Sequence, residues 1–92
     1  LSFRKPDVNK FPSLQLAKDC LKVGGTSFTV LNAVNEVCVE SFLKGRIGYL
    51  DIYKIISDIL DKSDITEVKG LDDVFEADTK SRRAALDIIR LN

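Results

Sequence analysis

Histidine, tryptophan and methionine are absent from this 92-residue sequence, and only two cysteines are present. Without histidine the sequence lacks the commonest general base, and it has no Ser/His/Asp or Cys/His set for nucleophilic catalysis. A tetrahedral zinc site would need carboxylates beside Cys20 and Cys38, which is an uncommon combination of ligands. We therefore predict no catalytic, cofactor-binding or metal-binding residue in this chain, and a structural or interaction role instead.

Long apolar runs and an excess of one charge are also missing. No stretch approaches the roughly 20 apolar residues needed to cross a bilayer, and no charged-then-apolar leader that signals secretion opens the chain. The 14 basic and 14 acidic residues cancel, and the isoelectric point is about 6.4. Nucleic-acid-binding domains usually carry a basic stripe instead. We therefore expect neither a membrane nor a nucleic acid as partner. Leu1 in first place fits either a processed product or an excised piece of a longer protein.

Cys20 and Cys38 both have apolar neighbours in helical patterns. This is the usual setting of a reduced, buried thiol, and we favour that interpretation over a disulfide or a reactive thiol. Because free thiols persist in reducing compartments, we predict a cytoplasmic or similarly reducing location.

Helical periodicity is what the sequence does contain, and it predicts an all-α fold of four helices. The helices are expected at about 12–23, 27–44, 50–62 and 71–90. Residues 1–11 lack this periodicity, and the prolines at 6 and 12 favour extended backbone before them. We predict an extended N-terminal arm over 1–11, the end of a linker, and a helical domain over 12–92. The arm should pack against another surface through its apolar side chains, which are Phe3, Val8 and Phe11.

Residues that favour the start or the end of a helix occur at the predicted helix boundaries. Gly24-Gly25 ends the first helix, because glycine readily adopts the left-handed conformation of a helix cap. Thr26 or Ser27 is competent to cap the second helix, and Asp51 opposes the dipole of the third. The second helix is apolar over most of its circumference, which predicts a central position in the core. Core-facing stripes of the first and fourth helices are expected to include Leu21, Leu71 and Phe75.

Two groups of polar residues interrupt these apolar patterns. In the second helix Asn32 and Asn35 share a face, and Glu36 follows them; they form either a polar site facing a ligand or a structural hydrogen-bond network. In the fourth helix Asp78 precedes Arg82 by four residues, the spacing of an ion pair, and a catalytic role for Asp78 would need a second acid, base or metal ligand. Because a buried amide without a partner costs about 1–3 kcal/mol, we favour structural roles. We predict five polar anchors, within the bundle or against another domain: Asn32, Asn35, Glu36, Asp78 and Arg82.

The stretch 24–43 resembles the long helix in the C-terminal domain of the 1-deoxy-D-xylulose 5-phosphate reductoisomerases. It has the Gly-Gly-Thr lead-in, the Leu-Asn-Ala-x-Asn-Glu core at 31–36 and the Phe-Leu end of that family. Matching residues also precede and follow it in order and spacing: Phe3, Pro6-Asp7, Phe11-Pro12, Leu14-x-Leu16-Ala17, Ile47, Asp51-Ile52, Ala77-Asp78, Arg82 and Ala85. The resemblance covers residues 1–91, and the departures are changes in packing, at Ser13, Val34 and Ser81.

This resemblance implies a parent enzyme that isomerises 1-deoxy-D-xylulose 5-phosphate and reduces the product with NADPH to 2-C-methyl-D-erythritol 4-phosphate, in non-mevalonate isoprenoid synthesis. It also implies Mg²⁺ or Mn²⁺ as a Lewis acid in the parent. In that family the nucleotide-binding and metal-binding motifs precede this region, so no catalytic residue is carried over to this sequence.

The resemblance further implies the partners and the location. The catalytic domain of the same enzyme is the expected partner, and the parents are typically homodimers. The expected compartment is the cytoplasm, or a plastid-type organelle in a eukaryote. An independent helical protein-interaction module is the alternative from another class of function.

Overall fold

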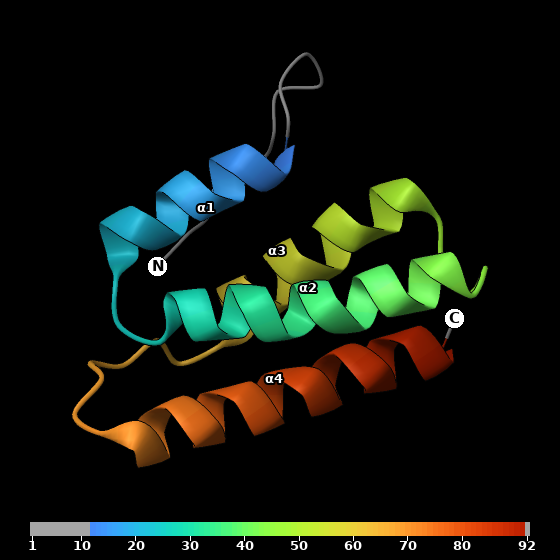
Figure 1. Ribbon diagram of the computed structural model, residues 1–92. Helices are drawn as coiled ribbons and strands as arrows, with labels where there is room; N and C mark the ends of the chain where they lie inside the picture. Colours follow the sequence, from blue (N-terminus) through green and yellow to red (C-terminus); the bar gives the residue numbers. More distant parts are fainter. Residues whose placement is uncertain (1–11, 92) are drawn as a thin grey trace.

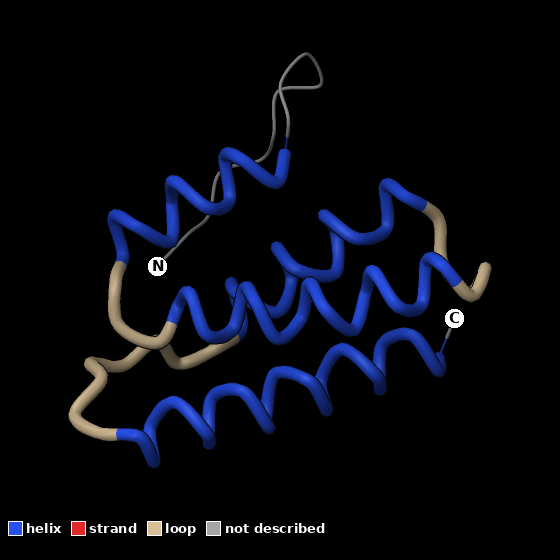
Figure 2. The backbone as a smooth tube through the Cα atoms, viewed as in Figure 1, coloured by secondary structure: helices blue, strands red, loops and turns tan. Residues whose placement is uncertain are grey.

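The computed structural model describes residues 12–91, which form four α-helices joined by short loops (Figures 1 and 2). They are α1 (Pro12–Val23), α2 (Ser27–Leu43), α3 (Tyr49–Lys62) and α4 (Leu71–Leu91). The all-α prediction is confirmed, and every boundary lies within one residue of its predicted place. The arm predicted over 1–11 lies outside the described residues. None of the four helices is long and apolar enough to span a membrane.

Helix α2 is the centre of the bundle, as its wide apolar surface predicts. It packs against each of the other three helices, and α3 and α4 also pack against each other. Consecutive helices run in opposite directions, and α1 and α4 lie on opposite sides of α2 (Figure 1). Helix α1 therefore covers α2 and α3 from one side only, and within 12–91 it makes no contact with α4.

The core consists of apolar side chains from all four helices, with most of them on α2 and α3. The buried members are Leu16, Cys20, Val30, Val34, Val37, Cys38, Ile55, Ile56, Ile59, Leu60, Ala85 and Ile89. The periodicity places three further residues in the core, and for these the prediction is wrong. Leu21, Leu71 and Phe75 are 70%, 74% and 64% exposed. The buried residues of α4 all lie in its C-terminal half. Ala77 still packs against the core, but Leu71 and Phe75 face away from it, and Leu21 lies on the outer side of α1.

Aspartates satisfy backbone donors at the starts of α3 and α4, and Asp51 does so at the helix start where it was predicted. The backbone N–H of Gly48 donates to Asp51 Oδ2 over 2.7 Å, and that of Lys69 donates to Asp73 Oδ2 over 2.8 Å. Each carboxylate satisfies a backbone donor next to a helix start, where negative charge also opposes the helix dipole.

The start of α2 differs from the prediction, because neither hydroxyl caps it. Thr26 occupies the N-cap position without a capping hydrogen bond from its side chain. Its backbone N–H instead donates to the Thr66 carbonyl over 2.9 Å, and its hydroxyl oxygen accepts the Thr66 N–H over 3.2 Å. The buried Ser27 hydroxyl lies 2.6 Å and 3.0 Å from the carbonyl oxygens of Gly24 and Cys20. The α1–α2 turn is thus bonded to the α3–α4 loop by a pair of hydrogen bonds, the Thr26–Thr66 bridge.

Cys20 and Cys38 are free thiols and fully buried, as predicted. Burial raises the pKa of Cys38 to about 11 and also raises the pKa of Cys20. The cause is the poor solvation of a thiolate in an apolar interior. Both sulfurs therefore stay protonated at neutral pH in the folded protein.

We expect neither thiol to react with a disulfide reagent at pH 8 in the folded state, because the thiolate is the nucleophile. The unfolded state loses the Cys38 proton near pH 9 and the folded state near pH 11, so the stability contributed by the protonated thiol falls as the pH rises between these values. Labelling rates and urea unfolding at pH 8 and pH 10 check this. Cys38→Ala is the control, since it should lose less stability over that interval. Labelling faster than global unfolding would contradict the prediction.

Candidate functional site

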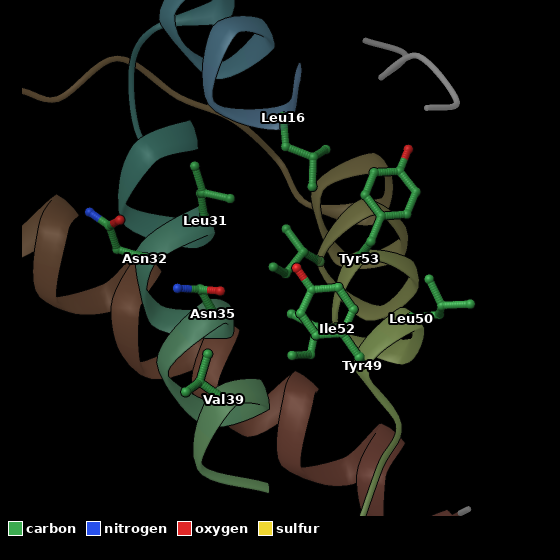
Figure 3. A pocket seen from close by; sticks show the side chains of 10 residues that line it. Leu16, Leu31, Asn32, Asn35, Val39, Tyr49, Leu50, Ile52 and Tyr53 are labelled. Carbon is green, nitrogen blue, oxygen red and sulfur yellow. The ribbon is translucent and has the colours of Figure 1, made fainter. Parts of the chain in front are cut away.

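The five predicted polar anchors divide into two groups on different faces of the bundle. Glu36 comes together with Asp78 and Arg82 between α2 and α4. Asn32 and Asn35 lie beside α3 and contribute to a groove (Figure 3).

Arg82 joins two carboxylates from two helices. Its Nε donates to Asp78 Oδ1 over 2.7 Å, and its Nη2 donates to Glu36 Oε2 over 2.8 Å. The pKa of Arg82 is raised above its ordinary value, first by the hydrogen bond to Glu36 and then by that to Asp78. The pair between Asp78 and Arg82 has the predicted spacing, whereas no local pattern indicates that Glu36 contacts Arg82. This cluster holds the side chains of α2 and α4 together at the surface of the bundle.

Replacing Glu36 with glutamine should lower stability only slightly, by about 0.2–1 kcal/mol, because exposed ion pairs are weakened by solvent. The side chains of Glu36 and Arg82 are 71% and 39% exposed. The loss should shrink at high salt, which screens the interaction. Urea unfolding at low and high salt measures it, with Glu76→Gln as control, since Glu76 pairs with Lys80 within α4 alone. A large loss that does not depend on salt would contradict this prediction.

A hollow of about 340 Å³ lies between α2 and α3, with one residue of α1 at its wall. We call it the α2–α3 groove. Its lining is mostly apolar and consists of Leu16, Leu31, Asn32, Asn35, Val39, Tyr49, Leu50, Ile52, Tyr53 and Ile56. Figure 3 shows Asn35 of α2 and Tyr49 of α3 on opposite sides of the groove, with Leu16 towards one end and Val39 towards the other. Leu50 and Tyr49 are 71% and 67% exposed, so the apolar surface continues to the rim.

The two asparagines do not form the buried network that was expected within the bundle. Both are exposed, and neither side-chain amide has a hydrogen bond among residues 12–91. The reason is geometric: α1 and α3 leave this side of α2 uncovered, so residues that interrupt the apolar surface face a groove instead of another helix. Their role as anchors therefore stays a prediction, and it points to something outside the described bundle.

The groove is suited to binding apolar groups together with hydrogen-bonding ones. Its polar atoms are amides and phenols, which donate and accept hydrogen bonds but carry no charge at neutral pH. Among residues 12–91 no group of three His, Cys, Asp or Glu side chains comes together that could hold a metal ion. Periodicity could have indicated a second apolar side of α3, because Tyr49, Leu50 and Tyr53 fall on a different side of the helix from Ile55 and Ile59, but it does not show that a groove lies there.

Comparison with known proteins identifies the family. The family model described as the DXP (1-deoxy-D-xylulose 5-phosphate) reductoisomerase C-terminal domain matches residues 1–84. The chain belongs to this family. The resemblance seen in the sequence is thereby confirmed, and the match includes the segment that precedes α1.

Reductoisomerases from several bacteria resemble this C-terminal domain closely. The 1-deoxy-D-xylulose 5-phosphate reductoisomerase of Pseudomonas savastanoi pv. phaseolicola is 49% identical over 85 residues, and that of Thermodesulfovibrio yellowstonii is 45% identical over 85 residues. In both cases the alignment covers 92% of this chain and 22% of the relative. The chain therefore spans about a fifth of the length of these relatives.

A solved structure shows the same fold. The 1-deoxy-D-xylulose 5-phosphate reductoisomerase from Zymomonas mobilis, in complex with NADPH, superposes with a TM-score of 0.82 at 40% identity. The superposition covers 94% of this chain and 23% of that one. The reductoisomerase C-terminal domain thus has its four-helix arrangement here as well.

Proposed function

We propose that this chain is the supporting domain of a 1-deoxy-D-xylulose 5-phosphate reductoisomerase and performs no chemistry itself. The observation that carries the proposal is the family match over residues 1–84. The described residues add to it, since their polar groups form a surface ion-pair cluster and an uncharged groove. The family match does not favour the alternative of an independent helical interaction module.

The reaction of the parent enzyme is proposed from its relatives. It would convert 1-deoxy-D-xylulose 5-phosphate to 2-C-methyl-D-erythritol 4-phosphate with NADPH, and the NADPH in the Zymomonas mobilis complex supports the choice of cofactor. Mg²⁺ or Mn²⁺, bound by the remainder of the polypeptide, would polarise substrate oxygens. We also propose a homodimeric parent in the cytoplasm or a plastid-type organelle.

The physical role of the domain would be to hold the catalytic part of the enzyme in place. Its partner would be the catalytic domain of the same enzyme, and the five polar anchors fit such a role in different ways. Arg82 with Glu36 and Asp78 ties α4 to α2. Asn32 and Asn35 instead offer exposed amides beside apolar surface, through which a further part of the same polypeptide can be held against the bundle.

An assay of NADPH oxidation with 1-deoxy-D-xylulose 5-phosphate and Mg²⁺ tests this proposal. Three proteins are compared: the full-length product, the same product with this domain removed, and the 92-residue chain alone. We expect activity only in the full-length enzyme, because the domain supports catalysis without supplying reacting groups. Circular dichroism of the shortened protein shows whether it remains folded.

Two results would contradict the proposal. Activity in the 92-residue chain would show that it contains reacting groups, and a well-folded but inactive full-length product would exclude this reaction. Adding the isolated domain back to the shortened protein is a further check. Restored activity would show that the domain supports catalysis through non-covalent contacts with the shortened protein.

A further inference from the structure

We infer that the α2–α3 groove is the docking site of the chain's own N-terminal segment, residues 1–11. The inference goes beyond the reductoisomerase function, because it concerns how this domain completes its own surface. It is independent of whether the parent enzyme carries out the proposed reaction.

The first argument is where the segment is attached. Helix α1 begins at Pro12, and Leu16, about one turn later, forms part of the groove wall. The wall on α3 runs from Tyr49 to Ile56, which is about 10 Å at the helical rise per residue. An extended chain advances about 3.3 Å per residue, so three or four residues cover that length. The eleven residues before Pro12 are more than enough to enter the groove and leave it again.

The covalent connection to α1 also favours binding of this segment in the groove over binding of any separate molecule. A segment attached by a short connection has an effective concentration of the order of millimolar at a site within its reach. A second copy of the chain or another protein would have to displace it. The groove is therefore most easily filled from the residues directly preceding α1.

The second argument is the chemistry of the groove. An extended segment that is not part of a sheet has unpaired backbone N–H and C=O groups, and each needs a partner when it is covered. An asparagine amide supplies both a donor and an acceptor, and Asn32 and Asn35 place two such amides along the groove. The apolar side chains between them offer places for the side chains of the segment. This combination fits a short extended peptide better than a small charged ligand.

The third argument is the sequence of the segment itself. It has three large apolar side chains in eleven residues, Phe3, Val8 and Phe11, and its Pro6 favours extended backbone in the residue before it. Leu50 and Tyr49 are exposed at the rim of the groove, and the two phenylalanines of the segment would cover them. Covering both removes apolar surface from water.

Urea unfolding of the complete 92-residue chain and three variants tests the inference. The first variant is Leu50→Ala in the groove. The second replaces the segment's apolar residues together (Phe3→Ser, Val8→Ser, Phe11→Ser), and the third combines both sets. We expect Leu50→Ala alone to lower the folding equilibrium constant on the order of tenfold, as loss of a covered leucine does. In the background of the segment variant the same change should have almost no effect.

Leu71→Ala is the matched control, because Leu71 is 74% exposed and lies on α4, on the other side of α2 from α1. It should leave the midpoint unchanged in both backgrounds. If Leu50→Ala is as neutral as Leu71→Ala, or if its cost is the same with and without the apolar segment residues, the inference is overturned.

A spin label at position 9 (Asn9→Cys) gives the location independently. The buried thiols of Cys20 and Cys38 stay unlabelled at neutral pH, so the nitroxide attaches to the new cysteine alone. We expect the amide NMR signals of Leu50 and Tyr53 to lose more than half of their intensity, and that of Leu71 to keep it. Broadening that depends on protein concentration would point to a second copy and overturn the inference. Unaffected groove signals would overturn it as well and leave the groove to the catalytic domain.

Discussion

Replacing Gly25 with alanine is expected to destabilise the domain by about 3 kcal/mol, far more than the same change at Gly24. Gly25 has a φ of +59°, and a β-carbon there would overlap the carbonyl oxygen of Thr66. An L-residue in this conformation costs roughly 1–2 kcal/mol, and moving Thr66 away also weakens the two hydrogen bonds to Thr26, each of about 1 kcal/mol. The close approach of the loop therefore adds to the cost of the backbone conformation.

Gly24→Ala separates these two causes. Gly24 has a similar φ of +72°, but nothing lies within 4 Å of its added β-carbon. This substitution should therefore lose only the stability that the left-handed backbone conformation costs an L-residue. Urea unfolding followed by circular dichroism gives both values, and hydrogen exchange at the Thr66 amide shows whether the bridge is lost. Equal costs at the two glycines would mean that the contact with Thr66 is unimportant.

Leu60→Ala should be similarly severe, with a loss of about 2–5 kcal/mol. Leu60 is 1% exposed and belongs to the core cluster on α3. Removing its side chain loses apolar burial and leaves a cavity that the surrounding helices fill only in part. Small domains have a total stability of about 5–15 kcal/mol, so this one change would remove a large share of it.

Leu43→Ala serves as the comparison, because the substitution is the same and Leu43 is 76% exposed at the end of α2. A surface change of this kind usually stays within about 0.5 kcal/mol. Equilibrium unfolding in urea measures both variants. If the two lost the same stability, the assignment of Leu60 to the core would be wrong.

The helices and the central place of α2 could be predicted because they depend on local patterns. Periodicity, the Gly24-Gly25 pair and Asp51 act within a few residues of one another, and α2 is apolar around most of its circumference. The family could be predicted as well, because its motifs are contiguous stretches of sequence. These features need no knowledge of which helix faces which.

The candidate site depended on contacts that local patterns do not contain. Arg82 and Glu36 are 46 positions apart, and only the packing of α4 on α2 brings them together. Asn32 and Asn35 were placed correctly on an apolar side of α2, but whether that side meets a helix or a groove is decided by α1 and α3. The prediction that Phe75 belongs to the core is wrong for the same reason. An apolar stripe shows which side of a helix is apolar, and not how far the neighbouring helices extend.

The composition of the α2–α3 groove determines what intrinsic fluorescence can report in this protein. The sequence has two tyrosines and no tryptophan, and both tyrosines line that groove. Emission excited near 280 nm therefore comes from this groove, where Tyr49 is exposed and Tyr53 is partly buried against the core. Quenching by acrylamide would follow the covering and uncovering of the groove, while the helices themselves would have to be followed by another signal.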